Sequence, residues 1–329
     1  MHRREFLVGA AGALGCTALS CAASRGSSSP SAGGSAGSSP LDLAAFQAAR
    51  RFASTQFGRI AYVERGAGPA ALFIHGLPLN GFQWRGALER LSPHRRCLAP
   101  DSMGLGYSEI PAGQDLAPEA QVDMLAAFLD ALAIRVADIV ASDSGGAVAQ
   151  IFAVRYPERV RTLLLTNCDV HEDSPPPLLL PVIAAARAGR FADETLVPQI
   201  KDKALARAPE GLGGFCYAYP ANLADDTIDY YLKPLVSSPL RVEQLHRYIV
   251  ALERNPLVAL EPALKRCQAP LRVIWGMRDP IFHRSSPDWL DRTFPRSRGV
   301  RRLADAKLFF PEELPDVVAE EARQLWLHS

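Results

Sequence analysis

Short, largely apolar runs bounded by turn residues recur along the 329-residue chain. Runs of this kind are typical of strands that are covered on both faces, as in a parallel sheet. They lie at residues 70–74, 137–141, 163–165 and 271–275. Residues 56–64 instead alternate apolar and polar positions, a pattern that is typical of an edge hairpin strand.

Helical patterns occupy the intervals between these runs, at residues 121–134, 146–156, 289–294 and 316–326. Strands that alternate with helices predict an α/β fold, in which a mostly parallel central sheet is flanked by helices on both faces.

One region breaks this alternation. Residues 172–262 contain no convincing strand and are helical in pattern, with several prolines. We interpret them as a helical lid inserted between two strands of a core that is formed by residues 41–171 and 263–329.

The start of the chain has a different composition. Arg3 and Arg4 precede an apolar run rich in alanine, glycine and leucine. This pattern resembles a twin-arginine export signal, and its small residues suit a signal better than a membrane-spanning anchor. We predict a signal over residues 1–23 and a flexible linker over 24–40, which is almost entirely Ser, Gly, Ala and Pro. The protein is therefore expected to be exported, to the periplasm or beyond.

Two cysteines in the signal bear on membrane attachment. Cys16 and Cys21 each end a segment similar to a lipoprotein cleavage site, although Ala13 and Ala18 stand where leucine is expected. A lipid-anchored protein and an unanchored exported protein would both carry such a linker, so both interpretations stay open.

Composition limits the kinds of partner. Hydrophobic residues make up 48% of the chain and charged residues 22%, with a formal net charge of +1. This balance is that of an ordinary globular protein and does not indicate a nucleic-acid partner. The cysteines beyond the signal match no zinc spacing, and their disulfide state stays open. They are Cys97, Cys168, Cys216 and Cys267.

The segment ASDSGG at 141–146 joins a predicted strand to a predicted helix. A nucleophile on such a tight turn needs small residues two positions before and two positions after it. Two registers satisfy this requirement, one centred on Asp143 and one on Ser144.

Three other polar turns follow predicted strands. They are HGLP at 75–78, APDSMGLGYS at 99–108 and WGMRDP at 275–280. In order along residues 57–326, these motifs resemble the haloalkane dehalogenase and epoxide hydrolase branch of the α/β-hydrolase superfamily. The resemblance implies an α/β-hydrolase fold and a hydrolase that acts on a small-molecule substrate, and it implies no metal and no organic cofactor.

The resemblance also implies a role for individual residues. The branch begins a glycine pair two residues after its nucleophile, and here Gly145 and Gly146 select Asp143. An aspartate nucleophile attacks carbon to give an alkyl-enzyme ester, which an activated water then hydrolyses. The oxyanion hole would be formed by the backbone N–H groups of Leu77 and Ser144.

Other positions are expected to support this chemistry. His75 and Gly76 would hold the oxyanion turn, and Asp101 would hold the turn after the fourth strand. Asp279 occupies the position of the family's acid, where it would orient or replace a base.

One position departs from the family pattern. The branch places a histidine between its last strand and its final helix, but residues 305–315 contain none and Leu308 occupies its position. Leucine cannot accept a proton, so the ester would lack its usual general base. We hypothesise that His171, with Asp169 beside it, approaches the nucleophile instead, and we consider His283 a weaker candidate.

Two further positions bear on the substrate. Dehalogenases of this type hold the leaving halide with a tryptophan directly after the nucleophile and often an asparagine in the oxyanion turn. Here Ser144 and Leu77 occupy these two positions, which argues against dehalogenation. Fluoroacetate dehalogenases carry an arginine after the nucleophile, so Ser144 does not fit that class either. Epoxide hydrolases instead use two lid tyrosines to protonate the ring oxygen. The lid offers Tyr217, Tyr219, Tyr230, Tyr231 and Tyr248.

Three functions agree with these observations. The first is a hydrolase for a small, largely apolar epoxide, halide or ester that reacts through Asp143. The second is a non-catalytic protein of the same fold that binds a ligand or partner, which Leu308 motivates. The third is an esterase that uses Ser144 and would need the same missing base.

Overall fold

The computed structural model describes residues 41–327. The predicted export signal (1–23) and linker (24–40), with the two candidate lipidation cysteines, lie outside the described residues. Within the described part of the chain, no helix combines the length and apolar character that crossing a membrane requires.

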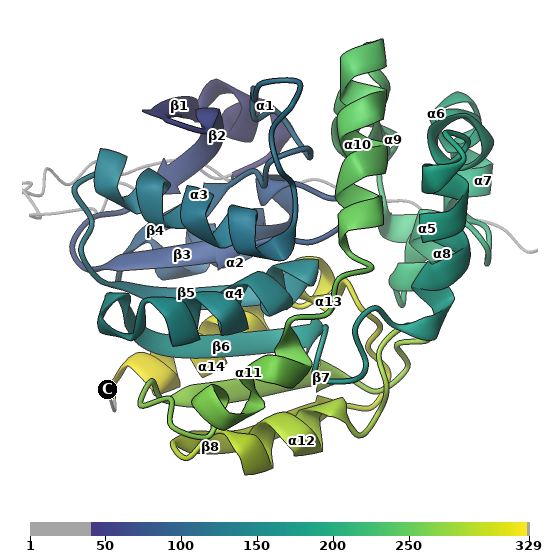
Figure 1. Ribbon diagram of the computed structural model, residues 1–329. Helices are drawn as coiled ribbons and strands as arrows, with labels where there is room; N and C mark the ends of the chain where they lie inside the picture. Colours follow the sequence, from purple (N-terminus) through teal and green to yellow (C-terminus); the bar gives the residue numbers. More distant parts are fainter. Residues whose placement is uncertain (1–40, 328–329) are drawn as a thin grey trace, which may run out of the picture. The chain divides into compact units, whose positions relative to one another are not determined.

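The core is an eight-stranded sheet with the strand order β1-β2-β4-β3-β5-β6-β7-β8 (Figure 1). The first two strands pair antiparallel with each other and β2 pairs antiparallel with β4, whereas the neighbours from β4 to β8 pair in parallel. The predicted mostly parallel α/β sheet is therefore confirmed. The strands are β1 Arg50–Thr55, β2 Gly58–Arg65, β3 Ala70–Ile74, β4 Arg96–Pro100, β5 Ala137–Asp143, β6 Val160–Cys168, β7 Leu271–Gly276 and β8 Ser297–Leu303.

The four apolar runs lie in β3, β5, β6 and β7. These strands are almost entirely buried, because helices cover both of their faces. The sequence pattern did not indicate β8, whose residues are all partly or fully exposed at the edge of the sheet. An edge strand of this kind needs no apolar run.

Helices flank the sheet on both sides (Figure 1). In one layer α3 (Pro118–Ala131) and α11 (Leu257–Leu264) pack against α4 (Ser144–Arg155). In the other layer α2 (Arg85–Leu91) packs against α14 (Pro315–Leu327). The remaining core helices are α1 Leu43–Ala48, η1 Gly81–Trp84, η2 Pro157–Arg159, α12 Ser286–Thr293 and α13 Phe310–Glu313.

No strand occurs between β6 and β7, and the intervening chain forms the predicted helical lid beside the sheet (Figure 1). Because α11 packs on α4, the chain has returned to the core by Leu257, which is earlier than the predicted boundary at 262. The lid helices are η3 Pro177–Leu179, α5 Leu180–Arg187, η4 Ala192–Leu196, α6 Val197–Lys201, α7 Lys203–Arg207, α8 Leu212–Cys216, η5 Pro220–Asn222, α9 Asp225–Leu232, η6 Lys233–Val236 and α10 Pro239–Ala251.

Candidate active site

The turn between β5 and α4 carries its backbone strain at Asp143. This residue has φ 58° and ψ −139°, a conformation that residues other than glycine rarely adopt. Ser144 is already the first residue of the helix. Of the two registers that the sequence left open, the geometry therefore places Asp143 at the apex of the elbow.

Small residues let the elbow close against the sheet. A Cβ atom added to Gly145 would lie 2.5 Å from the carbonyl oxygen of His75. One added to Gly146 would lie 2.3 Å from the Cβ atom of Cys168. Neither distance is sterically possible, so both positions require glycine.

The backbone amides predicted for the oxyanion hole converge on the nucleophile candidate. The N–H groups of Leu77 and Ser144 both donate to the carboxylate of Asp143. Gly76 permits this approach, because a Cβ atom there would lie 2.2 Å from that of Asp143. The same two donors are positioned to stabilise an oxyanion that forms on this carboxyl group.

The side chains of His75 and Asp101 each bind backbone groups of neighbouring turns. The buried His75 ring accepts a hydrogen bond from the Ser102 N–H through Nε2 at 3.0 Å, and burial lowers the pKa of the imidazole. Asp101 accepts hydrogen bonds from the backbone N–H groups of Gly81 and Tyr107, each at 2.8 Å. Neither side chain is therefore available to act on a substrate.

The acid candidate Asp279 follows β7 and is buried. Its Oδ2 accepts a hydrogen bond from the Asn167 amide at 2.7 Å, and its Oδ1 accepts one from the Ile281 N–H at 2.8 Å. Burial and the charge of Asp143 raise the pKa of this carboxyl to about 7, against the opposing effect of these donors. Asn167 holds the group in place, a role that the sequence did not indicate.

Three buried carboxyl groups share this region. Burial raises the pKa of Asp143 to about 6, and the hydrogen bonds from Ser144 and Leu77 limit the increase. Burial and then the charge of Asp143 raise the pKa of Asp169 to about 7. Within residues 41–327, no ion pair neutralises Asp143, Asp169 or Asp279. The site therefore combines three buried carboxyl groups whose pKa values are all raised.

Neither histidine candidate contacts the nucleophile. The His171 ring is hydrogen-bonded to Glu261 at 3.0 Å and stacks on Trp289 with 4.7 Å between ring centroids. His283 is exposed and pairs with the hydroxyl of the nearby Ser285. The hypothesis that His171 approaches Asp143 is therefore not supported, because its ring is engaged at the root of the lid.

Leu308 is fully buried in the loop between β8 and α13. The segment that contains it, 307–313, is bound to the lid, and we call it the latch segment. The Lys307 ammonium donates to the Gly214 carbonyl at 2.6 Å, and the Phe309 N–H donates to the Cys216 carbonyl at 3.0 Å.

Two glutamates extend this contact. Glu312 pairs with Arg85 at 2.7 Å and accepts hydrogen bonds from two lid tyrosine hydroxyls. Glu313 accepts hydrogen bonds from the backbone N–H groups of Ala218 at 3.0 Å and Tyr219 at 2.8 Å. The turn that would carry the base in the family pattern therefore connects the core to the lid.

One lid tyrosine lies beside the nucleophile. The Tyr248 hydroxyl on α10 is 3.0 Å from the Ser144 Oγ, and the side chain is 2% exposed. Burial raises the pKa of this phenol, and the charges of Asp143 and Asp169 add to the increase. Tyr248 is therefore a protonated donor that faces the elbow.

The other lid tyrosines are engaged elsewhere. Tyr217 and Tyr231 donate to Glu312 at 2.6 and 2.9 Å, and the Tyr230 hydroxyl accepts from Arg50 at 2.6 Å. Tyr219 is 59% exposed. The contacts made by the folded chain thus single out one of the five tyrosines that the sequence could not distinguish.

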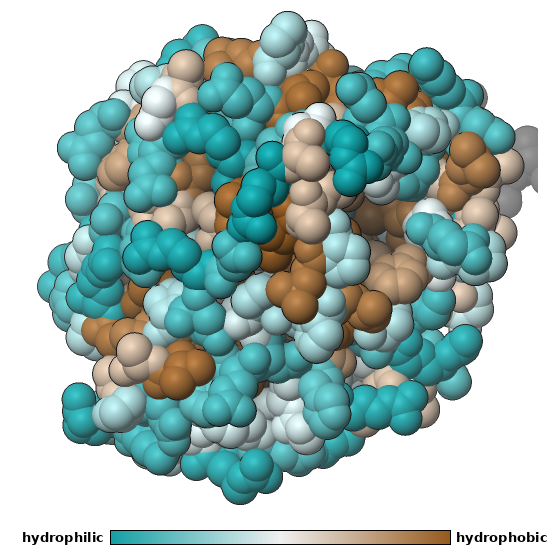
Figure 2. All heavy atoms as spheres, turned by 45° about the vertical axis from the view of Figure 1, so that its right-hand side comes forward, coloured by the Kyte–Doolittle hydropathy of each residue, from teal (hydrophilic) through white to brown (hydrophobic). Residues whose placement is uncertain are grey.

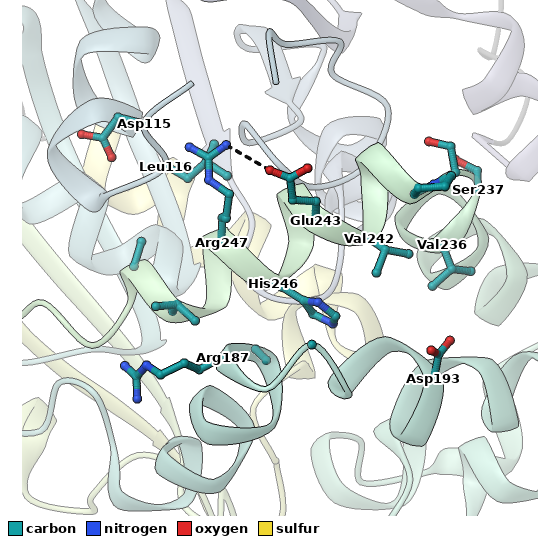
Figure 3. Close-up of a pocket in the computed structure, with 16 residues that line it drawn as sticks. Asp115, Leu116, Arg187, Asp193, Val236, Ser237, Val242, Glu243, His246 and Arg247 are labelled. Atoms are coloured by element: carbon teal, nitrogen blue, oxygen red, sulfur yellow. Dashed lines mark ion pairs between the residues drawn. The ribbon is translucent and has the colours of Figure 1, made fainter. Parts of the chain in front are cut away.

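Two cavities lie near the site without opening onto the elbow. One of about 1000 Å³ is lined by Val242, His246 and Val250 on the face of α10 that points toward α5 (Figure 3). Another of about 820 Å³ is lined by Asp279 and the two unsupported histidine candidates. Figure 2 turns this lid side forward and shows apolar residues gathered in hollows between polar ones.

The cysteines within residues 41–327 do not form disulfides. All four beyond the signal are buried free thiols: Cys97, Cys168, Cys216 and Cys267. Within the described residues, no group of three or more His, Cys, Asp or Glu side chains is arranged to hold a metal ion.

Comparisons with known proteins agree with this architecture. A family model described as the alpha/beta hydrolase fold matches residues 69–313. Haloalkane dehalogenase 2 of Mycobacterium tuberculosis is 27% identical over 287 residues, which cover 82% of this chain and 92% of that protein. A 2-hydroxy-6-oxo-2,4-heptadienoate hydrolase of Pseudomonas putida is 40% identical over 103 residues, 30% of this chain, and the match spans 37% of that protein's length.

Solved structures show the same fold. An epoxide hydrolase, CorEH, superposes with a TM-score of 0.70 at 20% sequence identity. The superposition covers 84% of this chain and 98% of that one.

Proposed function

Because the chain belongs to the α/β-hydrolase fold family, we propose that it hydrolyses small, largely apolar epoxides through a covalent ester on Asp143. Its named relatives are hydrolases, and the resemblance to a haloalkane dehalogenase extends over most of the chain. The observation that carries the choice of epoxide is the Tyr248 hydroxyl, which lies 3.0 Å from the Ser144 Oγ next to the nucleophile.

The first step opens the ring. A carboxylate oxygen of Asp143 forms a bond to an epoxide carbon, and the bond from that carbon to the ring oxygen breaks. The ring oxygen takes the proton of the Tyr248 hydroxyl, which removes the need to expel an alkoxide. The product is a hydroxyalkyl ester of Asp143.

The second step cleaves the ester. Water adds to the ester carbonyl carbon, and the charge that develops on the carbonyl oxygen is stabilised by the N–H groups of Leu77 and Ser144. The alkyl oxygen then leaves as the second hydroxyl of a diol. The regenerated carboxyl group of Asp143 releases a proton, which restores Tyr248.

Other substrate classes receive less support. A departing halide would find the side chains of Ser144 and Leu77, which offer no aromatic N–H and no amide. An esterase reaction at Ser144 would need a base next to its hydroxyl, and that hydroxyl is hydrogen-bonded to Tyr248. Both arguments favour an epoxide that reacts at Asp143.

A non-catalytic binding protein is the second candidate. Leu308 favours it, because a fully buried leucine stands where the family pattern requires a base. Such a protein would bind the substrate without forming a covalent bond.

The first prediction separates these functions by intact-protein mass. We expect incubation with an aryl epoxide such as styrene oxide to add the mass of one epoxide and to release its diol. Asp143→Asn should abolish both results, since an amide is a poor nucleophile, whereas Ser144→Ala should retain the adduct. No adduct and no diol in the wild type would favour the binding protein, and an adduct that depends on Ser144 would favour the esterase.

A further inference from the structure

The second step of the proposed reaction needs a base, and the described histidines do not provide one. Within residues 41–327, five histidines are present, and each is exposed or engaged away from Asp143. His75 and His246 accept backbone hydrogen bonds, His171 and His283 are paired with other side chains, and His94 is exposed.

Asp169 lies next to the nucleophile in the sheet. Asp143 on β5 is paired in register with Cys168 on β6, and Asp169 is the following residue. Carboxyl ends of neighbouring parallel strands meet at one edge of a sheet, where α/β proteins form their sites. The Asp169 carbonyl accepts a hydrogen bond from the Gln150 amide at 2.8 Å, so α4 holds the backbone in place.

The side chain of Asp169 is buried directly after β6, where the chain leaves the core for the lid. It is 6% exposed and accepts a hydrogen bond from the Ser174 hydroxyl. The charge of Asp143 raises the pKa of Asp169, and both carboxylates raise the pKa of the Tyr248 phenol. Asp143, Asp169 and Tyr248 are thus close enough for their charges to act on one another.

Asp279 is less suited to accept a proton from water. Its carboxylate already accepts three hydrogen bonds, from the Asn167 amide and from the N–H groups of Ile281 and Phe282. Asp169 has the Ser174 hydroxyl and its own N–H as partners, which leaves lone pairs for a water molecule. Nearby Asp173 is engaged by the His283 N–H and the Ser286 hydroxyl.

We infer that Asp169 is the general base that activates water to hydrolyse the ester on Asp143, an inference that rests on the proposed function. The water oxygen bonds to the ester carbonyl carbon while one water proton passes to the Asp169 carboxylate. The bond between that carbon and the alkyl oxygen then breaks, and the alkyl oxygen takes the proton from Asp169. Asp169 returns to its ionised form, and the ester becomes the carboxyl group of Asp143 and an alcohol.

The test separates formation of the adduct from its loss. Wild type, Asp169→Asn and a control, Asp305→Asn, are loaded with styrene oxide, freed of reagent and followed by intact mass. Asp305 is exposed and distant in sequence from the elbow. We expect Asp169→Asn to form the adduct within about threefold of the wild-type rate and to lose it roughly 10²-fold more slowly. The control should match the wild type.

A second readout distinguishes a base from a structural residue. The rate of adduct loss in the wild type should rise with pH through about 7, following the pKa of Asp169, and Asp169→Asn should lose this rise. Asp169→Glu, which keeps the carboxylate, should recover part of the rate. Equal rates of adduct loss in wild type and Asp169→Asn overturn the inference alone. A wild type that forms no adduct overturns the proposed function and the inference with it.

Discussion

At the scale of single residues, the site depends on buried carboxyl groups. Asp143 occupies a strained backbone position, and its carboxylate is held by two backbone amides. From the sequence, the elbow motif narrowed the candidates to Asp143 and Ser144, and the glycine pair of the family pattern selected Asp143. The sequence could not distinguish Tyr248 from the other lid tyrosines, because the face of α10 that meets the core is set by tertiary packing.

The role of Tyr248 as a proton donor can be tested by removing its hydroxyl group. In Tyr248→Phe we expect the rate of adduct formation with styrene oxide to fall by roughly 10²-fold, since the ring oxygen loses its proton donor. Tyr219→Phe is the matched control, because that tyrosine is 59% exposed, and its rate should equal that of the wild type. Stopped reactions analysed by mass spectrometry give both rates. Equal losses in the two variants would argue against a role for Tyr248 as proton donor.

The raised pKa of Asp143 predicts opposite effects of pH on reactivity and stability. The carboxylate must be ionised to attack, so adduct formation should rise with pH through about 6. The pKa of Asp143 is higher in the folded state than in the unfolded state. Its stabilising contribution to the free energy of unfolding is therefore complete below pH 3.8 and is lost as the pH rises through 6. Between pH 5 and pH 8 the free energy of unfolding of the wild type should fall by about 1 kcal/mol more than that of Asp143→Asn. Urea unfolding of both proteins at each pH measures this difference. A pH-independent difference between the two proteins would contradict this assignment.

At the scale of elements, most strands of the sheet could be predicted from the sequence. The contacts between the lid and the core could not. Apolar runs indicated the buried strands β3, β5, β6 and β7, whereas the polar edge strand β8 gave no such signal. The latch segment joins residues about ninety positions apart, such as Glu313 and Ala218. Pairings over such separations depend on the folded chain and leave no local pattern.

The contacts of the latch segment lead to a prediction about how firmly the lid is held. Glu313→Ala removes the acceptor for the N–H groups of Ala218 and Tyr219, and we expect it to lower the free energy of unfolding by roughly 1–3 kcal/mol. Hydrogen exchange should speed up at these two amides and stay unchanged at Ser144. Glu243→Ala, which removes an exposed partner of Arg247, is the control and should change stability by less than about 0.5 kcal/mol. Equal exchange in both variants would show that the latch does not hold the lid.

At the scale of the whole molecule, the fold and the position of the elbow at Asp143 could be predicted from motifs in the correct order, and the function could not. The departure at Leu308 left the chemistry open, and the structure adds two groups, Tyr248 and Asp169, that lie near Asp143 and can move protons. The account therefore depends on an ester between substrate and Asp143.

Turnover of an aryl epoxide in water enriched in oxygen-18 tests this ester most directly. Water attacks the carbonyl carbon of the ester, so we predict that the peptide containing Asp143 becomes heavier by one oxygen label and that the first diol released carries unlabelled oxygen. Asp143 that stays unlabelled while the diol takes up the label would show direct attack of water on the epoxide and would contradict the account.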